Sequence, residues 1–467
     1  MLKGLEISVI NFSKVKATGD IQRIDSEPFT FKKERISSKY PIERLSNLVT
    51  INPSKTEIEQ HKFMQASFIP MASISKGYIS NEEEVYVTDY IDKGYTYFKE
   101  DDLLIATITP CMEHGKCAIV QKMKYQIGFG STELVVFRVK NINNLLKEYL
   151  FSYLNRDTIR KRAAAYFIGT SGRQRVPTYF YKDLEIPLPS ISFQNKIKNY
   201  HLKSIDFRSQ SKILYSKAES LLLHELGLNN FEPTKEAVNI KSFKESFGNT
   251  KRLDAEYYQK KYDDLEIKIV SQKHLKIKDI RSANFRGLQP IYFEDGELYI
   301  INSKHILETT LDYDNFEKTK IEYWNKQEKA RVFRGDILTY TTGANIGRTQ
   351  VYLKNEKALA SNHVNIIRLK TENPFYVGFV LNSVVGRMQT EKRSAGSAQA
   401  ELYPKDLDEF LIPIIDLKKQ KQIAELVEES FKLKAESERL LEVAKKAVEM
   451  AIELDEESAI KFINSNK

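Results

Sequence analysis

Two cysteines and a histidine lie close together at Cys111, His114 and Cys117, and their side chains are typical zinc ligands. A structural zinc site uses four ligands, however, and this spacing is not that of the common zinc motifs. The chain also contains an internal repeat, described below, and the corresponding residues 343–349 of the second copy include neither cysteine nor histidine. A metal that the fold required would be needed in both copies, so we predict that the chain binds no metal.

Sequence motifs of self-sufficient enzymes are absent. The chain has no Gly-x-x-x-x-Gly-Lys-Ser/Thr phosphate loop, no Gly-x-Gly-x-x-Gly after a strand and no His-Glu-x-x-His. The Asn/Asp-Pro-Pro-aromatic tetrapeptide of amino-methyltransferases is also missing, because Asn373-Pro-Phe lacks one proline and opens a predicted helix. No Asp…Glu-x-Lys cluster indicates a nuclease site. We therefore predict no catalytic residues and a protein that is not an enzyme by itself.

Polar, glycine-rich loops indicate a different chemistry, which is contact with DNA. A backbone that turns through glycine can approach phosphates closely, while Ser, Thr, Gln and Arg side chains reach base edges. Such loops occur at 169–174 and 395–399, and polar strand turns occur at 107–116 and 341–348. Any single one could be a solvated loop of turn-forming residues, but their presence at matching places in two copies favours DNA binding. The predicted DNA-binding residues are Thr107, Thr109, Lys116, Gly169, Thr170, Ser171, Arg173, Gln174, Arg175, Thr341, Thr342, Asn345, Arg348, Lys392, Arg393, Ser397 and Gln399.

The composition is that of a globular protein. A chain of 467 residues, 41% hydrophobic and 11% aromatic, is long enough for two or three domains. Its two cysteines fit a reducing compartment. It has neither an apolar run of roughly 18 to 20 residues that could span a bilayer nor the apolar core of a signal peptide at its N-terminus, so we expect a cytoplasmic protein. The net charge of +9 is consistent with a polyanionic partner but does not prove one.

The chain contains the same pattern twice. Asp102-Leu-Leu corresponds to Asp336-Ile-Leu, and STELVVFR at 131–138 corresponds to SNHVNIIR at 361–368. Offsets drift between 226 and 234, as loop insertions and deletions would cause. The chain is thus two units, at about 7–228 and 237–454, each consisting of a globular module followed by a long helix.

Each module is predicted to be α+β with a curved sheet. Short alternating runs such as LLIATIT, CAIVQ and LVVFRV in the first copy, and DILTYTT, TQVYL and VNIIRL in the second, are typical of strands. Residues 145–162 and 374–392 are each predicted to form one helix. Near the start of each copy, Arg23, Asp25 and Glu27 match Arg252, Asp254 and Glu256, and we interpret them as a structural ion pair or a helix cap.

A heptad pattern defines the two long helices. Ser190 and Asp416, which occupy matching places in the two copies, are predicted N-caps, and Gly227 is a predicted C-cap. Small residues at position a face apolar residues at position d, as two closely packed helices require. A helix of about 35 residues is roughly 50 Å long, and the simplest arrangement pairs the two antiparallel, with a pseudo-two-fold axis across the pair. The predicted helix seam comprises Ile197, Ser204, Ser211, Ala218, Tyr200, Phe207, Leu214, Leu221, Ile423, Ser430, Ser437, Ala444, Leu426, Leu433, Leu440 and Ala447.

The chain resembles the specificity subunit of type I restriction-modification systems. The resembling residues are the two Arg-Ile/Leu-Asp-x-Glu openings, Asp102-Leu-Leu and Asp336-Ile-Leu, and the loops at 169–174 and 396–399. Ile186-Pro-Leu-Pro and Ile412-Pro-Ile then lead to Gln194 and Gln420 on the long helices. The family's Ser/Arg-Gly-Thr-Ile-Gly turn is Pro110-Cys-Met-Glu-His-Gly here in the first module and Thr342-Gly-Ala-Asn-Ile-Gly in the second. The resemblance covers nearly the whole chain.

The resemblance implies a domain organisation and a function. It implies a target-recognition domain at 1–189, a spacer helix at 190–228, a linker at 229–250, a second target-recognition domain at 251–415, a distal spacer helix at 416–454 and a tail at 455–467. Each domain would read one half of a bipartite, asymmetric site in double-stranded DNA. Two methyltransferase subunits carrying S-adenosylmethionine would dock on the helices and methylate adenine at N6, and two motor-nuclease subunits using ATP and Mg would join for restriction. No cofactor would be bound by this chain.

Three alternatives remain at this level. The chain could be an enzyme with an unrecognised site, although the unduplicated residues 1–6 and 455–467 are too short to hold one. It could be a coiled-coil scaffold without a nucleic-acid role, in which the glycine loops would tolerate substitution. It could also be the recognition subunit of a related system whose partner combines cleavage and methylation in one polypeptide.

Overall fold

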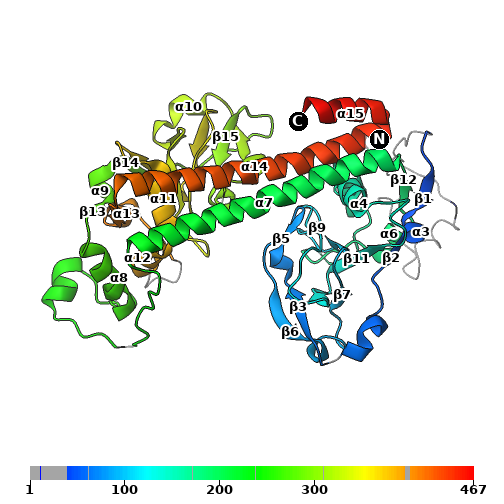
Figure 1. The fold of residues 1–467 in the computed structure, drawn as a ribbon. Coiled ribbons are helices and arrows are strands. Elements are labelled where there is room, and N and C mark those ends of the chain that lie inside the picture. Colours follow the sequence, from blue (N-terminus) through cyan, green and yellow to red (C-terminus); the bar gives the residue numbers. More distant parts are fainter. Residues whose placement is uncertain are drawn as a thin grey trace. The chain divides into compact units, whose positions relative to one another are not determined.

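The computed structural model describes residues 11, 39–61, 63–170, 172–236, 238–308, 310–394 and 400–466. The chain divides into two units (Figure 1). The first unit is Met1–Arg208 with Ala435–Lys467, and the second unit is Ser209–Lys434. Because the division runs through both long helices, each unit contains part of each helix and is described by itself.

An antiparallel four-stranded sheet with the same topology lies in each unit. The strand order is β2-β11-β8-β9 in the first unit and β14-β21-β18-β19 in the second. The strands predicted from LLIATIT, CAIVQ and LVVFRV, and from their second copies, are the last three of each sheet. The bounds are β2 Val49–Ile51, β8 Leu103–Ala106, β9 Cys117–Ile119, β11 Leu134–Val139, β14 Arg281–Arg286, β18 Ile337–Tyr340, β19 Thr349–Val351 and β21 Val364–Leu369.

A second four-stranded sheet also occurs in each unit, where the sequence indicated only one. Its order is β6-β3-β10-β7 in the first unit and β16-β15-β20-β17 in the second. The central pairs, β3 with β10 and β15 with β20, are parallel, and the remaining pairs are antiparallel. The bounds are β3 Gln65–Ile69, β6 Glu83–Tyr86, β7 Thr96–Phe98, β10 Gly128–Gly130, β15 Leu298–Ile301, β16 Glu317–Thr319, β17 Arg331–Val332 and β20 Ala358–Ala360.

Small elements complete the two units, and the two-stranded sheets among them occupy matching positions. A two-stranded sheet precedes each long helix, with β1 (Ile42–Arg44) paired to β12 (Glu185–Pro187) and β13 (His274–Lys276) paired to β22 (Leu411–Pro413). Strands β4 (Ile74–Ser75) and β5 (Tyr78–Ile79) form a further pair in the first unit. The short helices are α3 Leu45–Leu48, α6 Thr178–Lys182, α8 Lys260–Val270, α9 Ile277–Ile280, α10 Tyr323–Lys326 and α13 Pro404–Asp408. The 3-10 helices are η2 Lys55–His61, η3 Met71–Ser73, η4 Val87–Asp89, η6 Ser303–His305, η7 Tyr313–Asn315 and η8 Glu328–Ala330, and η5 Lys244–Gly248 is a short π-helix.

The predicted helices at 145–162 and 374–392 are each broken into two. The first consists of α4 (Lys147–Leu154) and α5 (Asp157–Ala164), and the second of α11 (Pro374–Asn382) and α12 (Val384–Ser394). At the first break the Asn155 amide donates to the carbonyl of Phe151 over 3.1 Å. At the second, the Ser383 hydroxyl donates to the carbonyl of Val380 and accepts from the N–H of Val385. These side chains compete with the helical backbone bonds and redirect the chain.

The two long helices begin and end as predicted. Helix α7 spans Ile191–Glu225 and helix α14 spans Leu417–Glu453. The Ser190 hydroxyl accepts from the N–H of Phe193 over 3.1 Å, and the Asp416 carboxylate accepts from the N–H of Lys418 over 2.9 Å. Gly227 ends α7 with φ at +65°, a conformation that glycine adopts without steric cost.

Pairs of serines join the two helices within each unit. In the first unit the hydroxyls of Ser204 and Ser437 lie 2.9 Å apart. In the second unit those of Ser211 and Ser430 lie 3.0 Å apart, and each also donates to the other residue's carbonyl over 2.8 Å. Such small side chains let the helix backbones approach closely. The pairing of Ser211 with Ser430, and then of Glu225 with Lys419 at 3.1 Å, makes the helices antiparallel in the second unit.

The small a positions, rather than the d positions, form the centre of the seam. All eight a residues are buried, whereas the d residues of α7 are only half-buried. On α14 the d residues Leu440 and Ala447 are buried, while Leu426 and Leu433 are half-buried. The half-buried d side chains therefore lie at the border of the seam, where Tyr200, Leu221 and Leu426 pack against the cores of the modules.

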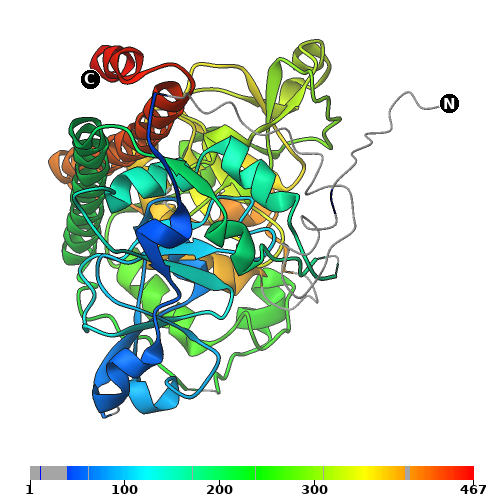
Figure 2. The ribbon, with the colours of Figure 1, turned by 90° about the vertical axis from the view of Figure 1, so that its right-hand side faces the viewer.

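Each helix pair is continuous with the hydrophobic core of its own unit. In the first unit Ile197, Ala444 and Val448 belong to the same core cluster as Tyr149 and Phe137. In the second unit Ala218, Ile423 and Val427 join Tyr376 and Ile367. The tail at 455–467 contains a further helix, α15 (Glu456–Ser465), beside the end of α14 (Figure 2). Its Ile463 is buried in the first core. None of the helices described is long and apolar enough to cross a membrane.

Candidate nucleic-acid interface

The strand turn and the glycine loop of the first unit are hydrogen-bonded to each other. The N–H of Val176 donates to the carbonyl of Thr107, and the N–H of Thr109 donates to the carbonyl of Gln174, both over 2.9 Å. Between these bonds, Arg175 forms antiparallel bridges with Ile108 and with Ile168. Residues 107–109 and 174–176, which are far apart in the sequence, therefore lie side by side. We call these two paired segments, with the turn and loop that they belong to, the loop pair.

The second unit has the same loop pair. The N–H of Leu402 donates to the carbonyl of Thr341 over 2.9 Å, and the N–H of Gly343 donates to the carbonyl of Ala400 over 3.2 Å. Glu401 and Thr342 form the antiparallel bridge between these bonds. The predicted residues Ser397 and Gln399 of this loop, and Ser171 of the first, lie outside the described residues.

Two of the predicted DNA-binding threonines are buried supports of the loop pair. The hydroxyl of Thr107 donates to the carbonyl of Glu133, and that of Thr341 donates to the carbonyl of His363, both over 2.9 Å. Both residues are at most 5% exposed. Lys392 is also buried, and its ammonium group lies 2.7 Å from the carboxylate of Glu266. These three side chains hold the framework together and do not extend from the surface.

The remaining predicted residues lie at or near the surface. Gly169, Thr170 and Arg173 are exposed. Lys116 donates to the carbonyl of Met71 over 3.0 Å, and Arg393 donates to that of Glu409 over 3.5 Å. The half-buried residues of this group are Thr109, Gln174, Thr342, Asn345 and Arg348. The exposed and half-buried donors thus surround the loop pair in each unit.

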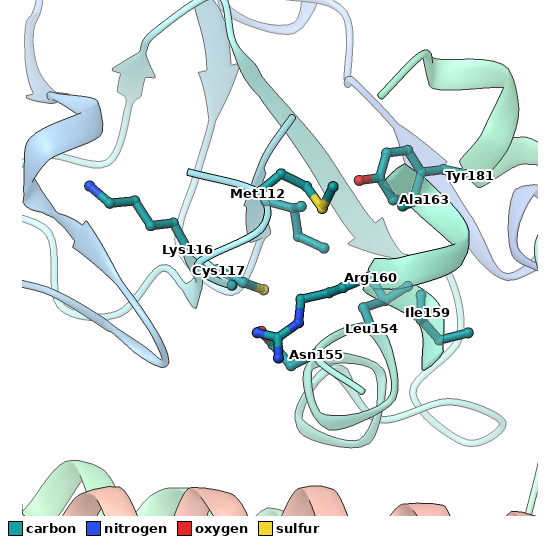
Figure 3. A pocket seen from close by; sticks show the side chains of 11 residues that line it. Met112, Lys116, Cys117, Leu154, Asn155, Ile159, Arg160, Ala163 and Tyr181 are labelled. Atoms are coloured by element: carbon teal, nitrogen blue, oxygen red, sulfur yellow. The ribbon is translucent and has the colours of Figure 1, made fainter. Parts of the chain in front are cut away.

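A glycine lets each strand turn lie close to the helices. Gly115 has φ at +69°, and a side chain there would overlap the Arg160 guanidinium. Gly347 has φ at +84°, and a side chain there would come within 2.6 Å of Thr390. A larger residue would have to lift either turn, because it would be strained and crowded. In the first unit a small cavity lies beneath this turn, lined by Met112, Cys117, Leu154, Asn155, Ile159, Arg160, Ala163 and Tyr181 (Figure 3).

The side chains of Cys111, His114 and Cys117, which were considered as zinc ligands, do not gather into a site. Within the part of the chain that the structure describes, no group of three His, Cys, Asp or Glu side chains is arranged to hold a metal ion. Cys117 is buried in strand β9, and burial raises the pKa of its thiol. Figure 3 shows its sulfur beside Asn155 and Arg160, while Lys116 points away from them.

One framework ion pair is repeated almost atom for atom. The guanidinium of Arg138 donates to both carboxylate oxygens of Asp102 over 2.8 and 2.7 Å. Arg368 donates to Asp336 over the same two distances. The sequence comparison aligned these four residues without assigning them a role. Two-point pairing of this kind fixes the strand that leads into each turn.

The Arg-x-Asp opening is a structural ion pair in the second unit, as predicted. Arg252 donates to both carboxylate oxygens of Asp254 over 2.8 and 2.5 Å, and its guanidinium lies 4.5 Å from the centre of the Tyr257 ring. It also donates to the carbonyl of Arg393 over 3.3 Å, which caps the last turn of α12. Arg23, Asp25 and Glu27 lie outside the described residues.

A charged residue that the sequence analysis missed lies at the centre of the second loop pair. Glu401 accepts from the Arg286 guanidinium over 2.5 Å and from the Tyr403 hydroxyl over 2.6 Å. The hydrogen bond from Tyr403, followed by that from Arg286, lowers the pKa of Glu401. The sequence prediction considered donor side chains such as Arg and Gln, whereas a carboxylate only accepts hydrogen bonds. Its alignment with Arg175, at the same offset as the helix caps, was the signal that could have found it.

Comparison with protein families gives two matches within the chain. The profile described as type I restriction modification DNA specificity domain matches residues 38–205 and 275–444. Each match begins just before or within the first strands of a unit and ends on a long helix. Together the two matches cover well over half of the sequence.

Two curated relatives from Escherichia coli are similar over part of their length. The type I restriction enzyme EcoAI specificity subunit is 32% identical over 191 residues, which are 40% of this chain and 31% of that protein. The EcoEI specificity subunit is 30% identical over 192 residues, with the same two coverages. The match therefore spans less than a third of the length of these relatives.

Two solved structures are similar at low identity. The HsdS subunit from Thermoanaerobacter tengcongensis is 14% identical with a TM-score of 0.33, and the match covers 91% of this chain and 100% of that one. The S subunit of a type I restriction-modification system from M. genitalium is 11% identical with a TM-score of 0.40, and the match covers 90% and 96%.

Proposed function

Because the chain belongs to the type I restriction-modification DNA specificity family, we propose that it is a sequence-specific DNA-binding subunit whose two units each read one half of a bipartite site. The observation that carries this proposal is the loop pair. In the first unit backbone bonds join the strand turn to the end of the glycine loop, and in the second unit equivalent bonds join the strand turn to residues 400–402. Polar and basic side chains surround the loop pair in both units. A scaffold without a DNA role would not require this surface twice.

The surface residues suggest how the work of recognition is divided. Exposed glycine and threonine at 169–170 allow a phosphate to approach the backbone. Arg173 and Arg175 in the first unit, and Asn345 and Arg348 in the second, are of the types that donate to base edges or phosphates. The net charge of +9 favours association with DNA and makes the affinity depend on salt. Thr107, Thr341 and Lys392 would act only by supporting these groups.

The two half-sites are proposed to differ in sequence. The loop pairs have the same backbone connections but different side chains, such as Pro110-Cys-Met-Glu-His-Gly against Thr342-Gly-Ala-Asn-Ile-Gly. Base recognition depends on side-chain donors and acceptors in the grooves. Unlike side chains on the same framework would therefore recognise unlike bases, which gives an asymmetric site.

The chemistry is proposed to come from partner subunits. Two methyltransferase subunits with S-adenosylmethionine would modify adenine at N6, and motor-nuclease subunits using ATP and Mg would add restriction where they are present. The long helices would carry the partner interface and set the distance between the half-sites. All of this would take place in the cytoplasm.

Mapping of adenine methylation tests the proposal directly. Single-molecule sequencing of the host genome, with and without this gene, should show one motif of two unlike short halves that loses methylation when the gene is deleted. A methylated motif that is unaffected by the deletion, together with no DNA binding by the purified protein, would contradict the proposal.

The spacer role has its own test. Inserting seven residues, which is one heptad, into both helices should increase the distance between the half-sites by roughly 10 Å. The methylated motif should then keep both halves and gain unspecified base pairs between them. A motif with unchanged spacing would show that the helices do not set it.

A further inference from the structure

One residue in each unit occupies the same position at the centre of the loop pair, but with opposite charge. Arg175 forms the bridge with Ile108 in the first unit, and Glu401 forms the bridge with Thr342 in the second. Arg175 and Glu401 are separated in the sequence by the same offset as the caps of the long helices, Ser190 and Asp416. Backbone bonds to the adjacent strand turn flank both residues on either side. The two side chains therefore start from equivalent backbone positions.

Arg175 is held at one edge of its guanidinium and open at the rest. One of its terminal nitrogens lies 2.9 Å from the carboxylate of Glu133, at the start of strand β11. The side chain is nevertheless 51% exposed. A guanidinium has five N–H donors in a fixed plane, so most of them remain available to a ligand at the surface.

Glu401 is held just as firmly but offers acceptors instead of donors. Arg286 binds one carboxylate oxygen and the Tyr403 hydroxyl binds the other, over 2.5 and 2.6 Å. Arg286 is itself fixed by a bond of 2.7 Å to the carbonyl of Leu402 and by the Tyr403 ring, 4.7 Å away. The Glu401 side chain remains 32% exposed. Each oxygen has two lone pairs, so both can accept a further hydrogen bond.

We propose that this position, 175 in the first unit and 401 in the second, determines one base in each half-site through the polarity of its hydrogen bonds. Arg175 donates to a base acceptor, for which the N7 and O6 atoms of guanine fit best. Glu401 accepts from an exocyclic amino group, either N4 of cytosine or N6 of adenine. The inference rests on the proposed function, which it extends to a named residue pair.

The negative charge of Glu401 excludes a role in binding phosphate. A carboxylate cannot bind phosphate, because both groups are negative, and it weakens non-specific attraction to DNA. Arg286 lowers that cost by pairing with the carboxylate. Next to DNA, an oriented acceptor of this kind gains energy only where a base presents a donor. This makes Glu401 a discriminating residue rather than a contributor to general affinity.

The competing explanation is that Glu401 only neutralises Arg286. Both explanations predict some loss of stability in Glu401→Gln. They differ in what happens to base discrimination, because a purely structural residue lowers the fraction of active protein equally for every DNA sequence. The ratio of methylation at correct and mismatched sites separates the two.

The experiment uses the full chain, expressed with its partner subunits, and maps methylated motifs genome-wide. In Glu401→Gln we expect discrimination at one base pair of the second half-site to fall about tenfold or more, since a good side-chain to base pair contributes about 1 to 3 kcal/mol. In Arg175→Gln the same loss should appear in the first half-site. All other positions of the motif should keep their discrimination.

Two ion-paired surface residues away from the loop pairs serve as matched controls. Glu236 lies 2.8 Å from Lys260, and Arg44 lies 3.6 Å from Asp183. Glu236→Gln and Arg44→Gln should leave the motif unchanged. Thermal unfolding of all four variants would verify that each is folded.

The outcomes separate this inference from the proposed function. If the wild-type protein directs no bipartite methylation, the proposed function itself fails. If the wild-type motif exists but Glu401→Gln and Arg175→Gln retain full discrimination, or lose it in both half-sites together, only the assignment of these residues is overturned.

Discussion

The two units share their buried contacts but differ at the centre of the loop pair. Asp102 with Arg138, and Asp336 with Arg368, form the same two-point ion pair with the same distances. At positions 175 and 401 the charge is reversed instead, and the counter-charge comes from different places in the sheet, Glu133 just before β11 and Arg286 at the end of β14.

The difference shows which residues the fold requires. Loss of one partner of a buried ion pair leaves an uncompensated charge, so both copies retain the pair. A partly exposed residue in the loop pair can change sign if a counter-charge is available nearby, at little cost to stability. Divergence is thus concentrated where a ligand would be contacted. The following experiments examine this contrast, in order of decreasing expected effect.

The framework ion pairs should contribute equally in the two units. Asp102 and Asp336 are only 1% and 2% exposed, and each also accepts a backbone bond, from Lys99 and Phe333 respectively. Asp102→Ala and Asp336→Ala should each lower the free energy of unfolding of their unit by about 3 to 5 kcal/mol. Urea unfolding followed by circular dichroism measures this. Glu457→Ala, which removes an exposed pair on α15, should cost less than about 1 kcal/mol. Clearly unequal costs for the two aspartates would end the equivalence of the frameworks.

The buried histidine His201 should make the first unit sensitive to mild acid. His201 is fully buried against Phe151, whereas the corresponding residue of the second copy is Val427. Burial, with a smaller effect of Lys147, lowers the pKa of His201 to about 4, from a usual value of 6.5. The unfolded state therefore binds the proton first as pH falls, so stability is full above about pH 6.5 and declines towards pH 4.

The size of this effect follows from the shift. About 1.4 kcal/mol per pKa unit gives a total loss of up to about 3 kcal/mol between pH 6.5 and 4. His201→Val, which installs the residue of the second unit, should remove most of this dependence. Urea unfolding at several pH values measures it, with His224→Val, at an exposed position of the same helix, as the control. An unchanged pH profile in His201→Val would assign the acid sensitivity to other groups.

Two arginines that have no ion-pair partner in the described part of the chain should separate the two half-sites. Arg173 belongs to the first loop pair and Arg348 to the second, and the ion pairs found among the described residues include neither of them. Arg173→Ala should weaken DNA binding by roughly 1 to 3 kcal/mol and relax specificity in one half-site only. Arg348→Ala should do the same in the other half-site. Binding to matched and mismatched duplexes measures this, and an equal loss on every sequence would identify a phosphate contact instead.

The serine pairs should contribute the smallest effect. Ser204→Ala leaves the buried hydroxyl of Ser437 without its partner and should cost about 1 kcal/mol. The double variant Ser204→Ala/Ser437→Ala removes both groups and should be closer to the wild type. In the second unit, Ser211 and Ser430 also donate to each other's carbonyl, so the double variant there should recover less. Double-mutant cycles measured by urea unfolding compare the two. The same coupling in both units would contradict this distinction.

The duplicated pattern was the strongest source of information in the sequence. Period-two alternation predicted the three strands β8, β9 and β11 with their copies, and residue type predicted the C-cap Gly227, whereas the duplicated pattern predicted the caps Ser190 and Asp416 and the two long helices. It also identified the turn and loop segments that the structure joins by hydrogen bonds. These features depend on local chemistry, such as period-two alternation and capping side chains, which a single sequence shows directly.

Features that depend on the particular contacts of a side chain could not be predicted. The helix breaks at Asn155 and Ser383 arise from side-chain bonds to nearby backbone. Thr107 and Thr341 resemble surface donors in sequence, yet they are buried because their strands end against a neighbouring carbonyl. The d positions of α7 are only half-buried because small a residues bring the helices together. Glu401 was missed because only donors were sought at the loops.

The division of the chain into units has a consequence for the order of synthesis. The second unit, Ser209–Lys434, is one continuous segment, whereas the first unit needs the distant segment Ala435–Lys467. Ala444, Ala447, Val448 and Ile452 of that segment are part of the first core. A growing chain therefore exposes the core of its first module until that segment has been made.

The module that is made second is then the first that can be completed. The first module must wait for the segment Ala435–Lys467 before its apolar surface is covered. Exposed apolar surface in such an intermediate promotes aggregation. A premature stop near residue 434 would thus damage the module encoded at the opposite end of the gene, while leaving the adjacent module intact.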